Sequence, residues 1–283
     1  MKLEYAPFDI IAEFNSDFNF HFPDDITPST SEQYDFEFVV AHEITHGLGF
    51  NTRWTSWDAF VNGLEGTKWL TPFFNVRRGS VVESWQPVSV FDLYLVDTAT
   101  QTSLMDYVNA IYGFKVSGLT LDGFANGFVK SGNPFMQAEK VYSLADSNQG
   151  AIAFKTAVFD GVSSLVILET GIKYSPASSI AHVDYDSYWG TSNFLMIPAA
   201  SRIQGQDLKS LLEARSSEGS IYGDLLLKIM TTIGYPSILD NSITTIEINP
   251  DISAFPAGNV ATGHSSVVKV SSLFLLVVLM SFF

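Results

Sequence analysis

The sequence predicts a mixed α+β fold, and features near both ends of the chain support this. Residues 8–14 and 18–22 are rich in aromatic and branched side chains, which is typical of strands. Residues 36–50 repeat apolar side chains every four positions, which is typical of an amphipathic helix. Residues 206–215 and 220–233 show the same spacing near the other end. We therefore expect short strands first and helices towards the C-terminus.

Composition limits the classes of function that the chain can have. It has 283 residues, 46% of them hydrophobic, enough for one large domain or two small ones with a real core. With 15 Lys+Arg against 30 Asp+Glu the formal net charge is -15, which disfavours nucleic acid and anionic membrane surfaces as partners. The absence of cysteine excludes disulfides, thiolate metal ligands and a cysteine nucleophile.

The helix predicted at residues 36–50 contains a His-Glu-x-x-His motif. Residues four apart lie on one face of a helix, so His42 and His46 can both reach one metal ion. A bound zinc ion lowers the pKa of its water to about 7. Glu43 can then take the proton of that water as it attacks a carbonyl carbon. The motif predicts a zinc hydrolase with Glu43 as general base.

The flanks of this helix carry start and stop signals. A capping box is possible before it, either Ser29 with Glu32 or Thr30 with Gln33. Two glycines follow His46 closely and permit the left-handed turn that ends a helix.

Zinc sites in hydrolases usually have three protein ligands, so a third must come from elsewhere. The commonest extended zincin motif has its glycine here at Gly49, but Thr52 stands where the third histidine should be. The other histidines are His21, His182 and His264. Among these, only His182 lies in a polar, carboxylate-flanked segment within the domain, which makes it the candidate histidine for the third ligand.

Three motifs together resemble the leishmanolysin-like metzincins and their microbial relatives. They are His-Glu-Ile-Thr-His-Gly-Leu-Gly-Phe at residues 42–50, Ser-Ser-Ile-Ala-His-Val-Asp at residues 178–184 and Leu-Met-Ile-Pro at residues 195–198. The order matches that of the family, in which a long insertion precedes the third histidine. The resemblance implies a metzincin-like zinc peptidase domain with an insertion at residues 51–180.

Carried over residue by residue, the resemblance implies a zinc site and its catalytic base. His42, His46 and His182 would be the Zn²⁺ ligands, Glu43 the general base, and Met196 the residue of the Met-turn beneath the metal.

Some assignments in the second motif have alternatives. Val183 stands where relatives often have tryptophan, which leaves the detailed specificity open. Asp184 or Asp186 is an alternative third ligand, although Asp184 better fits a role in orienting a ligand or nearby backbone. Tyr185 and Tyr188 are candidate donors to the oxyanion of a tetrahedral intermediate.

The middle of the chain gives weaker signals. We expect a short helix at residues 55–64, an apolar strand at residues 88–97, a helix within residues 141–159 and a buried strand at residues 162–169. The sequence contains no internal repeat.

The sequence predicts three regions: a catalytic domain at residues 1–237, a flexible linker at residues 238–266 and a hydrophobic tail at residues 267–283. Small residues, a polar spacer and a terminal apolar run are typical of a GPI-attachment signal, here with attachment within residues 258–263. A tail anchor and a segment buried in the fold are the alternatives.

A GPI signal requires entry into the secretory pathway, but residues 1–9 have no signal-peptide pattern. We therefore expect further N-terminal sequence in the complete protein. The expected location is extracellular or at the cell surface, with contact to the membrane only through a lipid anchor.

The sequence thus predicts a zinc metalloendopeptidase acting on a protein or peptide substrate. The alternative is a catalytically inactive surface-binding or adhesion module on the same scaffold. The presence of Glu43 favours the enzyme, because a scaffold that needs only the metal does not need the base.

Overall fold

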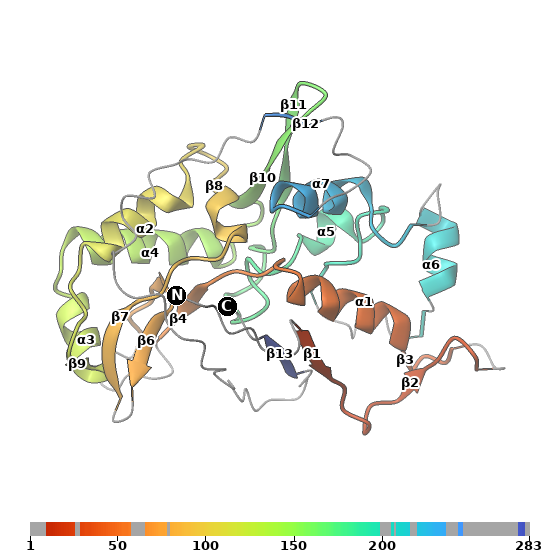
Figure 1. Cartoon of the computed structure of the whole chain (residues 1–283), viewed down its shortest axis with the longest axis horizontal. Coiled ribbons are helices and arrows are strands. Elements are labelled where there is room, and N and C mark those ends of the chain that lie inside the picture. Colours follow the sequence, from red (N-terminus) through yellow and green to blue (C-terminus); the bar gives the residue numbers. More distant parts are fainter. Residues whose placement is uncertain are drawn as a thin grey trace, which may run out of the picture.

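The computed structural model describes residues 10–25, 29–57, 66–77, 80–198, 205–206, 208–215 and 220–235, and the backbone of 243–245 and 277–280. Helices and several small sheets alternate along the chain, which confirms the predicted α+β class (Figure 1).

The helices are α1 (Phe36–Gly47), α2 (Leu104–Tyr112), α3 (Leu121–Phe128), α4 (Asn133–Ala145), α5 (Tyr185–Tyr188), α6 (Leu208–Arg215) and α7 (Asp224–Thr232), with the 3₁₀ helix η1 (Phe91–Tyr94). The strands are β1 (Ile10–Glu13), β2 (Phe20–His21), β3 (Tyr34–Asp35), β4 (Trp54–Ser56), β5 (Leu70–Pro72), β6 (Phe74–Arg77), β7 (Val81–Trp85), β8 (Leu95–Asp97), β9 (Leu119–Thr120), β10 (Ile152–Phe159), β11 (Val162–Ile167), β12 (Ile243–Thr245) and β13 (Val277–Met280).

Strand β10 organises the largest sheet. It pairs antiparallel with β11, β8 and β12, and α7 packs against it. A second sheet has the order β6-β7-β9 and lies with α2, α3 and α4 on one side of the molecule, while α1 and α6 lie on the other (Figure 1). The strands between α1 and α5 are therefore split between three sheets, because β4 and β5 pair only with each other, rather than forming a single layer.

One hydrophobic core joins the long insertion to α1. The ring of Phe50, just beyond α1, lies 4.7 Å from that of Phe91, and Phe91 lies 4.9 Å from Phe154 on β10. All three side chains are fully buried, and they belong to one cluster that extends to Met230 on α7. The insertion is thus packed into the same core as the helix that carries the His-Glu-x-x-His motif.

The N-terminus of α1 is capped by Asp35 rather than by the predicted box. Its buried carboxylate accepts from the backbone N–H of Phe38 at 2.8 Å and from that of Leu208, the first residue of α6, at 2.9 Å. The side chain of Asp35 therefore accepts a hydrogen bond from one otherwise free N–H group in each of two helices.

The predicted capping box was wrong because the chain makes a separate turn before the helix. The backbone N–H of Thr30 donates to Oε1 of Gln33 at 3.0 Å, and the N–H of Gln33 donates back to the carbonyl of Thr30. Thr30 and Gln33 thus make the reciprocal bonds of a capping box, but they close a turn that precedes the helix, and α1 begins later at Phe36.

The two glycines after the motif have different roles. Gly49 adopts a φ of 107°, as expected for a left-handed end to the helix. Gly47 is still helical, and a Cβ atom there would lie 2.9 Å from the side chain of Ile10. Gly47 therefore allows β1 to pass close to α1.

Several predicted elements in the insertion need correction. Of the helix predicted at residues 55–64, residues 55–56 belong instead to strand β4, which pairs with β5, and residues 58–64 lie outside the described residues. The helix predicted within residues 141–159 is only the last turn of α4, and β10 follows it. Strand β11 is present, but it lies at the sheet edge and only Val166 of it is buried, while the other side chains are half-buried or exposed. The apolar run at residues 88–97 is split between η1 and β8.

The predicted linker and tail lie mainly outside the described residues, as does the domain boundary at residue 237. Within the linker, only the backbone of β12 is described, beside β10. Within the tail, the backbone of β13 pairs antiparallel with β1. Among the described residues, no helix combines the length and apolar character needed to cross a membrane.

The shared cap predicts a measurable loss of stability. Replacing Asp35 with Ala leaves two buried N–H groups without acceptors and should lower the free energy of unfolding by about 2–4 kcal/mol. Asp35→Asn keeps one acceptor and should cost roughly half as much. Urea unfolding of chelator-treated protein measures both, and equal losses for the two variants would contradict the double cap.

Candidate metal centre

The structure brings the three predicted histidines together. The Nε2 atoms of His42 and His46 are 3.2 Å apart, those of His42 and His182 are 3.2 Å apart, and those of His46 and His182 are 3.3 Å apart. Helix α1 supplies two of these rings, one turn apart, and the loop before α5 supplies the third. The predicted convergence is confirmed, and these three residues form a group that could hold a metal ion.

The other nitrogen of each ring is bonded to a backbone carbonyl. His42 Nδ1 lies 2.7 Å from the carbonyl oxygen of Leu195, and His46 Nδ1 lies 2.7 Å from that of Phe50. His182 Nδ1 lies 3.0 Å from that of Ser178. A carbonyl only accepts, so each Nδ1 must carry the proton. All three Nε2 atoms therefore present lone pairs to one another.

Facing lone pairs fit a bound cation. Two nitrogens that each bind zinc at about 2.0–2.1 Å with a tetrahedral angle lie about 3.3–3.4 Å apart, close to the spacing seen here. Such a centre would use three protein ligands and leave a fourth position open, as in catalytic zinc sites.

Burial favours the neutral, metal-binding form of these rings. Desolvation, with a smaller contribution from His46, lowers the pKa of His42 to about 3. Desolvation also lowers the pKa of His46 and, together with the two neighbouring rings, lowers that of His182 well below its ordinary value. The cluster does not need to lose protons to bind a metal at neutral pH.

Glu43 lies beside the cluster on α1, between the two motif histidines. Its side chain is partly buried, and burial raises the pKa of its carboxyl to about 7. A carboxyl group with such a pKa can both take and release a proton near neutrality.

The Leu-Met-Ile-Pro segment contacts both parts of the cluster. The carbonyl of Leu195 accepts from His42, and the carbonyl of Met196 accepts from the N–H of Val183, next to His182, at 2.8 Å. The Met196 side chain is 1% exposed. This segment therefore links α1 to the loop that carries the third histidine.

Thr52, at the position of the usual third histidine, instead anchors the chain after α1. Its hydroxyl donates to the buried carboxylate of Asp92 at 2.7 Å, and the N–H of Arg53 donates to the same carboxylate at 2.8 Å. The N–H of Ser89 adds a third bond. Burial raises the pKa of Asp92. This anchor had no signal in the sequence, since Asp92 belongs to no motif.

The alternative carboxylate ligands are not part of the histidine cluster. Asp184 caps α5 by accepting from the N–H of Ser187 at 2.8 Å, and both Asp184 and Asp186 lie 3.4–3.5 Å from the amide nitrogen of Gln149. The assignment of either aspartate as third ligand was therefore wrong, while the role of Asp184 in orienting backbone is confirmed.

The two tyrosines proposed as oxyanion donors differ in their surroundings. The hydroxyl of Tyr188 is buried and accepts from the N–H of Ile167 at 3.0 Å, so this bond holds α5 against β11. The ring of Tyr185 is partly exposed and stacks on Trp189.

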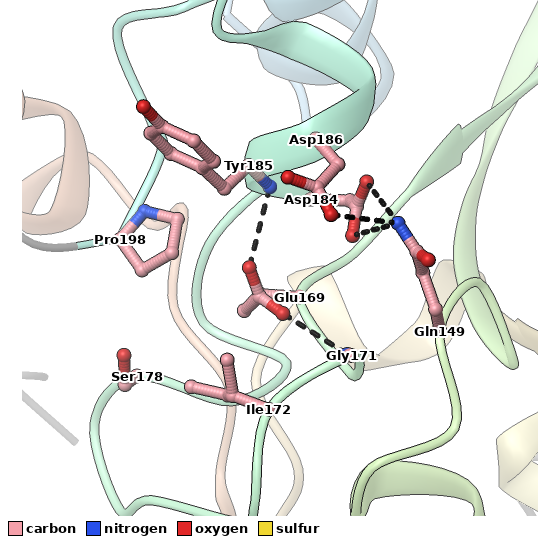
Figure 2. Close-up of a pocket in the computed structure, with 9 residues that line it drawn as sticks. All are labelled: Gln149, Glu169, Gly171, Ile172, Ser178, Asp184, Tyr185, Asp186 and Pro198. Atoms are coloured by element: carbon pink, nitrogen blue, oxygen red, sulfur yellow. Dashed lines mark hydrogen bonds between the residues drawn. The ribbon is translucent and has the colours of Figure 1, made fainter.

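A small cavity of about 180 Å³ lies next to the His182 loop (Figure 2). It is lined by Gln149, Glu169, Gly171, Ile172, Ser178, Asp184, Tyr185, Asp186 and Pro198. Glu169 is 2% exposed and lies among several backbone groups of the loop. No sequence pattern distinguishes Glu169, which is the last residue of the strand predicted at residues 162–169.

The other histidines do not join this cluster in the described part of the chain. His21 is buried on β2, where its backbone pairs with that of Asp35. His264 lies outside the described residues.

Sequence comparisons identify a family. The profile of the SPBPB7E8-like family matches residues 1–266, so the chain belongs to this family. The chain is also similar to a protein of Schizosaccharomyces pombe (strain 972 / ATCC 24843) that is named "Uncharacterized protein PB7E8.01", with 27% identity over 226 residues. The match covers 74% of this chain but 38% of that protein, so the chain spans well under half of its relative. No solved structure shows significant similarity.

Neither match concerns leishmanolysin-like enzymes, so that resemblance stays a prediction. The family match ends at residue 266, where the predicted hydrophobic tail begins.

Removing the third histidine should impair metal binding more than folding. Loss of a residue that only orients a metal ligand typically weakens metal affinity by about 10- to 100-fold. Because His182 would bind the metal directly, we expect His182→Ala to weaken Zn²⁺ affinity by more than about 100-fold. His21→Ala removes a buried histidine outside the cluster and should leave the affinity unchanged. Competition with a chromogenic chelator measures both, and equal affinities for wild type and His182→Ala would exclude His182 as a ligand.

Proposed function

We propose that this member of the SPBPB7E8-like family is a zinc-dependent endopeptidase. The observation that carries the proposal is the convergence of three Nε2 lone pairs beside Glu43, with every Nδ1 bonded to a carbonyl. Three neutral imidazoles with an open fourth position are typical of catalytic zinc.

The residues of the centre have separate roles in this proposal. A zinc ion bound there would supply Lewis acidity for a water and for the carbonyl oxygen of a peptide bond. His42, His46 and His182 would hold the ion. Glu43 would accept a proton from the attacking water and pass it to the nitrogen of the leaving amine. Its place between the two ligands of α1 supports this assignment.

A metzincin-like arrangement of the domain is part of the proposal. Support comes from the contacts of Leu195 with His42 and of Met196 with Val183, since they place the Leu-Met-Ile-Pro segment against both halves of the cluster. The α+β architecture and the arrival of the third histidine after a long insertion are compatible with it.

Replacing the base should separate catalysis from metal binding. Glu43→Gln keeps the size of the side chain but cannot accept the proton, so peptide hydrolysis should fall by about 100-fold or more while Zn²⁺ stays bound. Glu37→Gln is the matched control, because Glu37 lies in the first turn of the same helix. Cleavage of a quenched-fluorescence peptide library and the zinc content of each variant would be measured.

A chelator should abolish the cleavage and added Zn²⁺ should restore it. If folded, zinc-loaded protein cleaves no peptide of the library, the endopeptidase proposal fails. The catalytically inactive binding module would then be the better description of the chain.

A further inference from the structure

The loop that carries His182 has an unusual backbone. Ile180 has a φ of 67°, a left-handed conformation that branched side chains rarely adopt, and its side chain is fully buried. Ala177 has a φ of 62°. This path lets the carbonyl of Ser178 accept from His182 Nδ1. Such a conformation persists only where neighbouring groups hold it.

Glu169 supplies backbone contacts to this loop. Its N–H donates to the carbonyl of His182 at 2.8 Å, and its carbonyl accepts from the N–H of Ile180 at 2.9 Å. These bonds fix the main chain at Ile180 itself and at His182, two residues further on.

The side chain of Glu169 adds contacts that the backbone cannot make. Oε2 accepts from the N–H of Tyr185 at 3.2 Å, and Oε1 accepts from the N–H of Gly171 at 3.0 Å (Figure 2). The carboxylate therefore joins the start of α5, just beyond His182, to the turn after β11.

The surroundings of the Glu169 carboxylate disfavour its charged form. Both Glu169 and the neighbouring Asp184 are 2% exposed, and burial, with a contribution from Asp184, raises the pKa of Glu169. A glutamine would have the same shape without the charge. It would, however, turn an NH₂ group towards one of the two N–H donors, so only a carboxylate accepts both.

We propose that Glu169 is a positioning residue for the third metal ligand. Its backbone bonds hold the main chain at Ile180 and His182, and its carboxylate holds the N–H of Tyr185. In this proposal the carboxylate is required to keep the Nε2 atom of His182 facing those of His42 and His46 before a metal is bound. The inference rests on the metal centre of the proposed function, but it does not require peptidase activity.

The test compares metal affinity with stability in Glu169→Gln. Zn²⁺ affinity would be measured by chelator competition, the visible spectrum of the Co²⁺ form would report coordination, and thermal unfolding of chelator-treated protein would report folding. We expect affinity to fall about 10- to 100-fold, the range typical of outer-shell partners of metal ligands. The Co²⁺ spectrum should change in shape or intensity.

Asp186→Asn is the matched control. It removes a carboxylate from the same cavity, but one that contacts Gln149 rather than the His182 loop. Affinity within twofold of wild type for Glu169→Gln, or an equal loss for Asp186→Asn, would overturn the proposal. A wild-type protein that binds no metal would overturn both this inference and the proposed function, whereas a metal-binding protein without peptidase activity would overturn only the latter.

A backbone substitution covers the case in which Glu169→Gln does not fold. Tyr185 is the first residue of α5, and Asp184 before it has φ -59° and ψ 125°, which suits a following proline. Tyr185→Pro removes the N–H that donates to Glu169, and Tyr185→Ala removes the same ring but keeps the N–H. Weaker Zn²⁺ binding by the proline variant than by the alanine variant would support the role of Glu169, and equal binding would refute it.

Discussion

The candidate centre depends on three hydrogen bonds between imidazole Nδ1 atoms and backbone carbonyls. Each bond fixes which nitrogen carries the proton and so leaves every Nε2 lone pair free to face the others. The carbonyls come from Phe50, Leu195 and Ser178, which lie in three different loops. Because backbone carbonyls are the acceptors, the shape of those loops matters more to the site than their side chains.

This requirement explains why the insertion shares a core with α1. Phe50 must present its carbonyl to His46 while its ring is buried against Phe91. The Asp92 carboxylate holds the chain two and three residues further on through Thr52 and Arg53. The chain after α1 is thus fixed by a buried residue of the insertion, and the insertion contributes to the geometry of the centre.

The sequence predicted the parts of the site that depend on local patterns. The spacing of His42 and His46 and the glycine turn at Gly49 are short-range signals, and the structure agrees with them. His182 was reached by elimination and by resemblance, and it also converges. Asp35 was missed as the cap of α1 because the two possible capping boxes upstream were preferred, and its bond to Leu208 spans 173 residues. Glu169 was missed because it belongs to no recurring pattern and the loop and helix that it holds lie further along the chain. In the same way, pairing with β5 makes residues 55–56 part of a strand, although they begin the helix predicted at residues 55–64.

A third histidine 136 residues after His46 is less costly than its separation suggests. The entropy of closing a flexible loop grows only with the logarithm of its length, and a folded insertion brings its own ends together. Here Asp92 bonds to the N-terminal end of the insertion, at Thr52 and Arg53, and Glu169 bonds to its C-terminal end, at Ile180 and His182. Both are buried carboxylates that accept from backbone N–H groups. Thr52 can therefore replace the nearby histidine of the extended motif without loss of a third imidazole, because the folded insertion delivers His182 instead.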